Sequence, residues 1–283
     1  MRASVLLCMV LLSMTSAVHC RAQLPPQIQL SADTVLVDEK VATVVSGLAP
    51  GQPVTVRLSA TLGGLTWAAH AAFIADARGR VDLATLAATS GTYERADPMG
   101  LFWSALQDTT SAPPAAATPL PRPSLPDPEL IQLIAEVDGQ AAALTTLRRR
   151  FVQEGVRLMP VRESGLVASF YEPPQPGPHP ALMILGGSGG GIPERTAQLL
   201  ASHGYAALAV GYFGMAGLPA SLSLIPLEYF GRALEWLQAQ RAVDGTKVGV
   251  LGGSRGGELA LLLAATHPQI TAVVACAPSA STE

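Results

Sequence analysis

The sequence contains little cysteine and little charge, and each scarcity excludes a class of protein. Three cysteines occur in 283 residues, at Cys8, Cys20 and Cys276, too few for the disulfide framework of a small secreted domain. Charged residues make up 14% of the chain, and the formal net charge is −3. No basic stripe with interleaved aromatic residues is present, so no nucleic-acid partner is predicted. The five histidines show no ligand spacing, and the sequence predicts neither a metal nor a cofactor.

The N-terminus has the pattern of an export signal. Arg2 supplies the positive charge, Ala3–Val18 is apolar, and Ala22 is a small residue suited to cleavage. We therefore expect residues 1–22 to be a signal peptide and the mature protein to be exported, periplasmic or secreted. Without such a signal the protein would be cytoplasmic. Cys20 raises the alternative of a lipoprotein, which the histidine before it disfavours. No later stretch approaches the length of a membrane-spanning helix.

The first part of the chain predicts a β-sandwich over residues 23–139. Short alternating segments are separated by glycine-rich and proline-rich turns, and no cluster of titratable side chains accompanies them. The expected strands are Gln27–Leu30, Val41–Val45, Val54–Leu58, Trp67–Ile74, Arg80–Leu83 and Glu129–Val137. The proline-rich segment Thr109–Asp127 is then a long loop of the sandwich.

The second part, residues 140–283, predicts an α/β domain. A helix over Gln140–Glu154 leads into it, and the run Arg148–Arg150 is interpreted as the solvated face of that helix. The remaining elements are expected to be strands at 156–161, 166–171, 181–185, 206–210 and 271–276, helices at 194–203 and 227–240, and a strand followed by a helix around Ser254. This alternation indicates a mostly parallel sheet covered on both faces. Cys276 is expected to be a small buried residue of the last strand.

The stretch Val248–Glu258 carries the clearest chemical signal. Gly252-Gly253-Ser254-Arg255-Gly256 fits the G-x-S-x-G nucleophile elbow, with a strand before it and an apolar helix after it. The glycines allow a sharp turn close to neighbouring backbone, and the helix N-terminus stabilises negative charge on a tetrahedral intermediate. The alternative is a glycine-rich turn of some other doubly wound domain. We predict Ser254 as the nucleophile.

A second glycine-rich loop, Gly186–Gly191, follows an apolar strand. In the nucleophile-elbow geometry the oxyanion hole uses the backbone N–H of the residue after the serine, here Arg255, and a second N–H from such a loop. Ser188 and Gly189 are the candidates for that second donor. The loop is not a P-loop, because no Gly-Lys-Ser/Thr follows, and a dinucleotide fingerprint would leave the serine motif unexplained.

The partners that a serine nucleophile needs are absent from their expected positions. The acid and the histidine should follow the serine, but the 29 residues after Ser254 (283 − 254) contain one histidine, His267. Thirteen residues along the same predicted helix, it would lie about 20 Å away. Glu258 is expected to cap the helix or to be solvated. The sequence therefore predicts an α/β domain truncated before its last strands, with the triad acid and histidine missing.

Several motifs together resemble one known family. They are Gly47–Val54, Trp67, Ala75–Asp76, Gly79–Leu83, Gly91–Tyr93, Asp97–Trp103, Gly186–Gly191, Leu227–Phe230 and Gly252–Leu259. The most specific is Asp97-Pro-Met-Gly-Leu-Phe-Trp103. This set resembles the acyl-CoA thioester hydrolases and bile acid-CoA:amino acid N-acyltransferases. The resemblance implies an immunoglobulin-like domain followed by an α/β-hydrolase domain similar to dienelactone hydrolase.

The same resemblance implies a function. The family's nucleophile position matches Ser254, and serine rather than cysteine there implies hydrolysis rather than transfer to an amino acid. The family's aspartate and histidine match no position in this chain. The expectation is an acyl-CoA thioesterase-like hydrolase that forms an acyl-enzyme on Ser254, inactive as this 283-residue chain. Because acyl-CoA is intracellular and the N-terminus looks like an export signal, an exported carboxylesterase or peptidase is one alternative. A non-catalytic, degenerate binding protein is the other.

Overall fold

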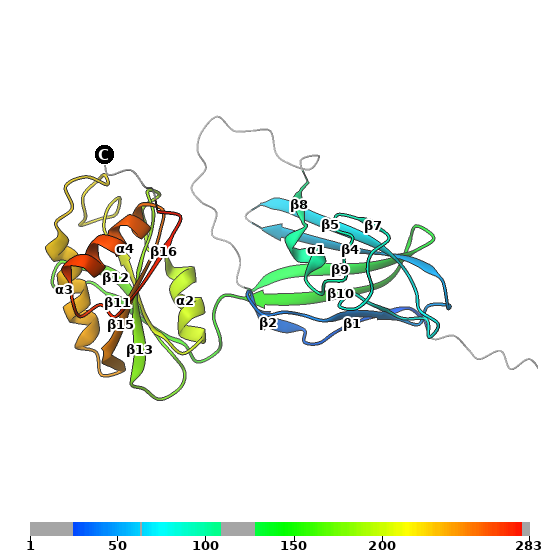
Figure 1. Ribbon diagram of the computed structural model, residues 1–283, viewed down its shortest axis with the longest axis horizontal. Helices are drawn as coiled ribbons and strands as arrows, with labels where there is room; N and C mark the ends of the chain where they lie inside the picture. The colour runs from blue at the N-terminus through cyan, green and yellow to red at the C-terminus, as the bar shows by residue number, and fades with distance from the viewer. Residues whose placement is uncertain (1–24, 63, 109–127, 279–283) are drawn as a thin grey trace, which may run out of the picture.

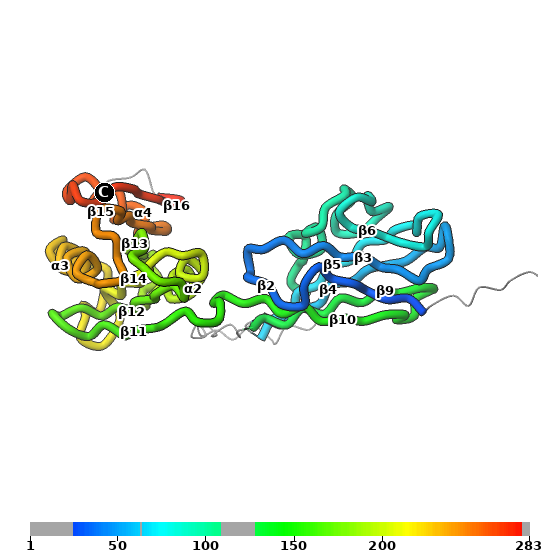
Figure 2. Tube along the Cα trace, turned by 90° about the horizontal axis from the view of Figure 1, so that it is seen from below, coloured from blue at the N-terminus to red at the C-terminus, as the bar shows by residue number. Residues whose placement is uncertain are grey.

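The computed structural model describes residues 25–62, 64–108 and 128–278, which form two bodies along the long axis of the molecule (Figures 1 and 2). The N-terminal body is built from strands, and the C-terminal body combines a sheet with helices. The chain passes between them once, after strand β10. The predicted signal peptide and the proline-rich loop lie outside the described residues. Within those ranges no helix combines the length and the apolar character needed to cross a membrane.

The N-terminal body consists of two sheets that share one apolar core. The smaller has the order β1-β3-β6, with β1 at Gln27–Leu30, β3 at Thr43–Ser46 and β6 at Val81–Asp82. The larger has the order β2-β10-β9-β4-β5-β7, and β8 also pairs with β5. Its strands are β2 Thr34–Leu36, β4 Pro53–Leu62, β5 Leu65–Ile74, β7 Ser90–Gly91, β8 Leu106–Gln107, β9 Glu129–Val137 and β10 Gln140–Arg150; the short helix α1 is Gly100–Trp103. Val45 and Val81 of the small sheet join Val56, Phe73 and Leu133 of the large one in the core.

The helix predicted over Gln140–Glu154 is wrong, because this segment forms strand β10. β10 pairs antiparallel with β9 and parallel with β2, and Leu147 is fully buried in the shared core. The turn between β9 and β10 is Asp138-Gly139, with φ angles of 51° and 75°. Two positive φ angles at an Asp-Gly pair are typical of a two-residue hairpin. The boundary predicted between the β-sandwich and the α/β domain, at 139/140, therefore falls inside a hairpin. The N-terminal sheet continues to Arg150.

The C-terminal body is a six-stranded sheet with the order β11-β12-β14-β13-β15-β16. β11 and β12 pair antiparallel and β12 is antiparallel to β14, whereas the last four strands of that order are parallel. The elements are β11 Arg157–Val161, β12 Val167–Glu172, β13 His179–Leu185, α2 Glu194–Ser202, β14 Ala206–Gly211, α3 Leu227–Gln238, β15 Val243–Gly253, α4 Arg255–Thr266 and β16 Ala272–Cys276.

The two faces of this sheet are covered by different helices. Met183 points into the core with Phe230 of α3 and Leu263 of α4, whereas its neighbour Ile184 points into the core with Ala197 of α2. Because successive side chains of a strand alternate, β13 must be apolar on both faces, and this explains its unbroken apolar run. The strands and helices predicted after residue 155 are all present.

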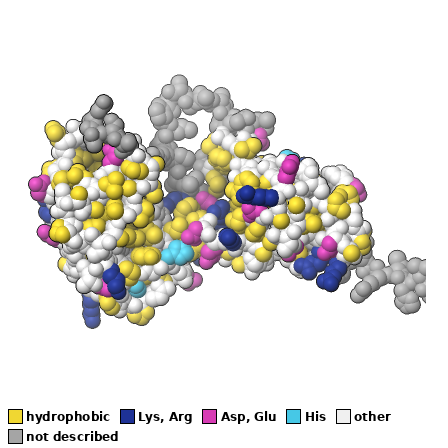
Figure 3. Space-filling model, in the orientation of Figure 1, with side chains coloured by type: hydrophobic (Ala, Val, Ile, Leu, Met, Phe, Trp, Pro, Cys, Tyr) yellow, Lys and Arg dark blue, Asp and Glu magenta, His cyan; other side chains and the backbone are white. Residues whose placement is uncertain are grey.

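Cys276 was predicted to be buried, but it is exposed. β16 is the edge strand of the sheet, and its neighbours Val273 and Val274 are also exposed, at 39% and 48%. Helix α4 packs on β16, but Val273, Val274 and Cys276 remain exposed, so an apolar sequence does not ensure burial here. Hydrophobic side chains gather on the face of this body that carries α4 and β16 (Figure 3).

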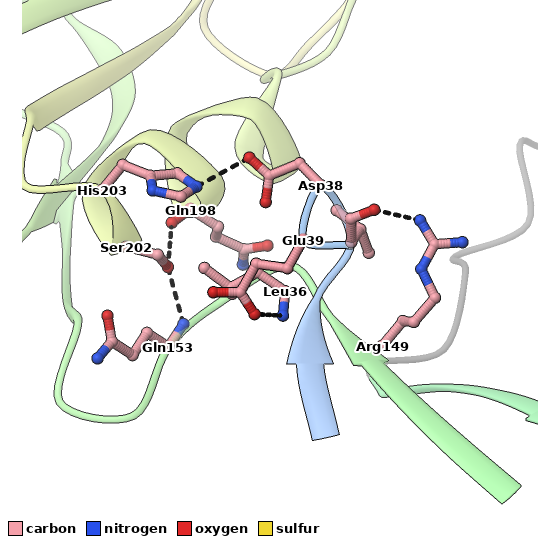
Figure 4. Close-up of polar contacts among 9 residues, drawn as sticks. Leu36, Asp38, Glu39, Arg149, Gln153, Gln198, Ser202 and His203 are labelled. Atoms are coloured by element: carbon pink, nitrogen blue, oxygen red, sulfur yellow. Dashed lines mark hydrogen bonds and ion pairs between the residues drawn. The ribbon is translucent and has the colours of Figure 1, made fainter. Parts of the chain in front are cut away.

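The two bodies meet at helix α2 (Figure 4). At its C-terminal end, His203 Nε2 lies 2.8 Å from Asp38 Oδ2 of the N-terminal body, and Ser202 Oγ accepts a hydrogen bond from the Gln153 N–H at 2.8 Å. Nearer its N-terminal end, the Arg195 guanidinium lies 3.9 Å from the centre of the Phe151 ring. These polar contacts hold α2 against the end of the N-terminal sheet.

Candidate active site

Ser254 occupies a strained turn between β15 and α4. Its backbone has φ 53° and ψ −126°, a region that a residue with a Cβ rarely adopts. Its N–H donates to the Cys276 carbonyl at 2.8 Å, which fixes the turn against the neighbouring strand. The hydroxyl does not cap the helix, and the side chain is exposed. The strand-serine-helix context predicted from the sequence is present; the nucleophilic role remains a prediction.

Two of the glycines around Ser254, Gly252 and Gly256, are required by backbone contact. A Cβ on Gly252 would lie 1.9 Å from the Gly256 carbonyl oxygen, and a Cβ on Gly256 would lie 2.4 Å from the Gly186 carbonyl oxygen. Real Cβ atoms do not approach backbone this closely. A Cβ on Gly253, in contrast, would meet nothing within 4 Å. Gly256 thus allows the turn that carries Ser254 to pack directly on the loop after β13.

That loop, Gly186–Gly191, lies beside the serine as the sequence predicted. A Cβ on Gly187 would be 3.3 Å from Ser254 Cβ and 3.8 Å from Ser254 Oγ, so the loop passes close to the serine side chain at this glycine. Ser188 and Gly189 are exposed, and their N–H groups make no backbone hydrogen bond within the described part of the chain. At the start of α4 the Gly257 and Glu258 N–H groups donate to the Ser254 carbonyl, whereas those of Arg255 and Gly256 make no backbone hydrogen bond within the described residues. Unpaired N–H groups therefore lie on both sides of Ser254.

The sequence predicted this loop without singling out Gly187, and it missed Tyr212. The Tyr212 phenol donates a hydrogen bond to the Gly186 carbonyl, which holds the loop in place. Burial raises the pKa of Tyr212, so the phenol stays protonated and remains a donor near neutral pH. A signal for Tyr212 existed, because it directly follows β14, and the carboxyl ends of parallel strands meet at one edge of the sheet.

The histidines of the described ranges all lie away from Ser254. His267 is at the far end of α4, where its ring contacts Thr266 and the Leu263 carbonyl. His179 Nε2 lies 2.9 Å from the Gln175 carbonyl oxygen, His203 pairs with Asp38, and His70 belongs to β5 of the other body. Glu258 pairs with Arg255 at 2.8 Å. No described residue therefore stands as a base for Ser254, and no group of three His, Cys, Asp or Glu side chains gathers there as a metal site.

We predict that Ser254→Gly stabilises the chain. The substitution removes the Cβ that strains the backbone at φ 53°, a relief that exceeds the added flexibility of the unfolded chain. The free energy of unfolding should rise by about 1 kcal/mol in urea denaturation. Ser254→Ala keeps the Cβ and serves as the control, with little change expected. If glycine and alanine gave the same stability, the backbone at this position would not be strained.

The strand order of the second sheet, with an exposed serine on a strained turn between a strand and a helix, is that of an α/β-hydrolase domain. Two family models match the chain. Residues 38–163 match the model described as the acyl-CoA thioester hydrolase/BAAT N-terminal region, and residues 225–283 match the BAAT/acyl-CoA thioester hydrolase C terminal model. Together they cover well over half of the chain. The chain belongs to the acyl-CoA thioester hydrolase and bile acid-CoA:amino acid N-acyltransferase family.

The curated relatives agree with this assignment. Over 238 residues the chain is 38% identical to the mouse protein acyl-coenzyme A thioesterase 2, mitochondrial, covering 84% of this chain and 52% of the relative. It is 37% identical to acyl-coenzyme A thioesterase 1 of mouse, covering 84% of this chain and 57% of that protein. The chain therefore spans about half the length of the curated relatives it matches. Among solved structures, a putative dienelactone hydrolase from Klebsiella pneumoniae is 22% identical, with a TM-score of 0.40 over 45% of this chain and 61% of that chain.

Proposed function

We propose that this protein is a serine thioester hydrolase acting on acyl-CoA through an acyl-enzyme on Ser254. The observation that carries the proposal is the exposed Ser254 hydroxyl, held on a strained backbone between two sets of unpaired N–H groups. Strain of this kind is found mainly at functional sites. The relatives named as acyl-CoA thioesterases support the thioester as substrate.

The chemistry follows from this arrangement. Ser254 Oγ attacks the thioester carbonyl carbon while its proton passes to a base, and the carbon–sulfur bond breaks to release the CoA thiol and leave an ester on Ser254. Water then attacks that ester and releases the carboxylic acid and the free serine. In each step the carbonyl oxygen becomes an oxyanion. We assign its stabilisation to the Arg255 N–H and to an N–H of Ser188 or Gly189.

The base is the missing part of this proposal. Because no described histidine approaches Ser254, we expect residues 23–283 alone to be slower than an enzyme with a complete triad by about a millionfold in kcat. We further propose, from the family resemblance, that the N-terminal body is immunoglobulin-like, and from the sequence pattern that residues 1–22 direct export. An exported protein would meet esters other than acyl-CoA, so a carboxylesterase is the second candidate.

An external base tests the mechanism. Purified chain is incubated with palmitoyl-CoA and increasing imidazole, and thiol release is measured. We expect an imidazole-dependent rate above that of the Ser254→Ala variant, which reports the uncatalysed reaction with imidazole. Mass spectrometry should show the acyl group on Ser254. Equal rates for the two proteins at every imidazole concentration would contradict Ser254 as the nucleophile, and faster turnover of p-nitrophenyl acetate would favour the carboxylesterase.

A further inference from the structure

A groove of about 610 Å³ lies between the loop after β14, helix α3 and helix α4. Its apolar walls are Leu222, Leu224 and Ile225 of the loop, Phe230 of α3, and Leu259 and Leu262 of α4. This volume falls within the range of small-molecule sites, which are mostly apolar with a few polar groups. None of these residues belongs to the elbow motif.

The groove begins beside the nucleophile. Arg255, the residue after Ser254, lines one end, and Glu258, Leu259 and Leu262 continue the same wall along α4. Residues three and four apart lie on one face of a helix, so these side chains form a continuous stripe. From Arg255 to Leu262 the stripe extends about 10 Å at 1.5 Å per residue. One end of the groove is therefore lined by the residue next to Ser254 in the chain.

The charges of the groove disfavour a phosphate ligand. Its charged lining residues in the described structure are Arg255 and Glu258, and these pair at 2.8 Å. A phosphate is normally bound by cations or by several donors that are not already neutralised. The rest of the wall combines two residues with hydroxyl groups, Tyr212 and Ser223, with leucine, isoleucine and phenylalanine side chains, which gain free energy by contact with hydrocarbon. The groove therefore fits the acyl end of a thioester rather than its nucleotide end.

Leu224 marks the rim of the groove. It is 97% exposed, and its φ angle is 54°, so a large apolar side chain is held out in solvent on an unfavourable backbone. A hydrocarbon ligand that contacts Leu224 would remove apolar surface of this side chain from water, which is favourable.

We propose that this groove binds the hydrocarbon chain of the acyl group, and that Leu259 and Leu262 determine how long a chain it accepts. The proposal rests on the thioester hydrolase function proposed above and adds to it the position of the acyl subsite. It predicts that affinity rises by about fourfold for each methylene group until the groove is filled.

The test measures binding without turnover, in the Ser254→Ala chain. A dansyl-labelled undecanoic acid is bound first and then displaced by saturated fatty acids of increasing length. Leu262→Asp should weaken probe binding by about tenfold or more, because it places a charge in the apolar wall. Leu261→Asp is the matched control, since both leucines are 47% exposed on α4 and only Leu262 lines the groove. We expect Leu261→Asp to change affinity by less than about twofold.

The outcomes separate the two proposals. An equal loss in both aspartate variants, or displacement that does not depend on chain length, would overturn the acyl groove. Leu262→Met keeps the wall apolar and should bind the probe like the parent. Loss of probe binding in this variant would also overturn the acyl groove. Circular dichroism establishes that each variant is folded. Probe binding does not involve the Ser254 hydroxyl, so a negative result here leaves Ser254-dependent hydrolysis untouched. Normal binding without Ser254-dependent thiol release would overturn only the hydrolase proposal.

Discussion

Gly252→Ala is expected to destabilise the α/β body by about 3 kcal/mol. The new Cβ would lie 1.9 Å from the Gly256 carbonyl oxygen and 2.8 Å from the Gly257 nitrogen. Both of these atoms belong to the backbone of the first turn of α4, so no side chain can rotate away to make room. Relief requires α4 to move away from β15, which disturbs the core between them. Urea denaturation followed by far-ultraviolet circular dichroism measures the change as a lower midpoint at constant slope.

Gly253→Ala provides the matched control one residue further along. It makes the same chemical change in the same strand, but its Cβ would meet nothing within 4 Å. We expect its stability to stay within about 1 kcal/mol of the parent, because the loss of flexibility in the unfolded chain slightly favours alanine. If Gly252→Ala were as stable as Gly253→Ala, the close approach of the two backbones would not exist in solution.

The second large effect concerns strand β10. A fragment of residues 25–152 should fold with a cooperative thermal transition, whereas a fragment of residues 25–139 should show none. Without β10, strand β2 loses its described pairing partner, β9 becomes an edge, and the fully buried Leu147 is removed from the core. Thermal unfolding followed by circular dichroism distinguishes the two fragments.

Both fragments contain residues 25–139 and differ only in residues 140–152, so each serves as the control for the other. A cooperative transition of the shorter fragment at the temperature of the longer one would show that β10 is dispensable. A longer fragment without any transition would show that the N-terminal core depends on the α/β body. Either result would contradict the assignment of β10 to an independently stable N-terminal body.

The sequence predicted the α/β body well because its signals are local. Apolar runs such as 181–185 and 206–210 are bounded by turns, and amphipathic spacing identifies α3. The Gly186–Gly191 loop and Ser254 could be brought together in advance, because the ends of parallel strands share one edge of a sheet. The contact of Gly187 with Ser254 depends on how the loop turns, which no spacing in the sequence records, whereas Tyr212 was indicated only by its place directly after β14.

The wrong predictions, a helix over 140–154 and a buried Cys276, concern features that depend on contacts between residues far apart in the chain. Alanine, leucine and arginine in 140–150 favour a helix locally, but pairing with β9 and β2 overrides that preference, as strand propensity depends strongly on context. The Asp138-Gly139 pair was the signal that could have corrected this, since it is a typical hairpin turn. Burial of Cys276 was inferred from an apolar strand, yet burial depends on what packs over the strand. The contact between His203 and Asp38 joins residues 165 positions apart, a distance no local pattern spans.

Exposure of Cys276 makes the region around Ser254 accessible to spectroscopy. It is the one cysteine of the described ranges, its thiol is exposed, and its carbonyl accepts the hydrogen bond from the Ser254 N–H. A maleimide fluorophore or a nitroxide on this sulfur would be attached to the residue whose backbone carbonyl contacts the turn that carries Ser254. In a chain with Cys8 and Cys20 removed, the label would report on the local environment of the turn that carries Ser254, and the acylation proposed for Ser254 would be tested in real time without a chromogenic substrate.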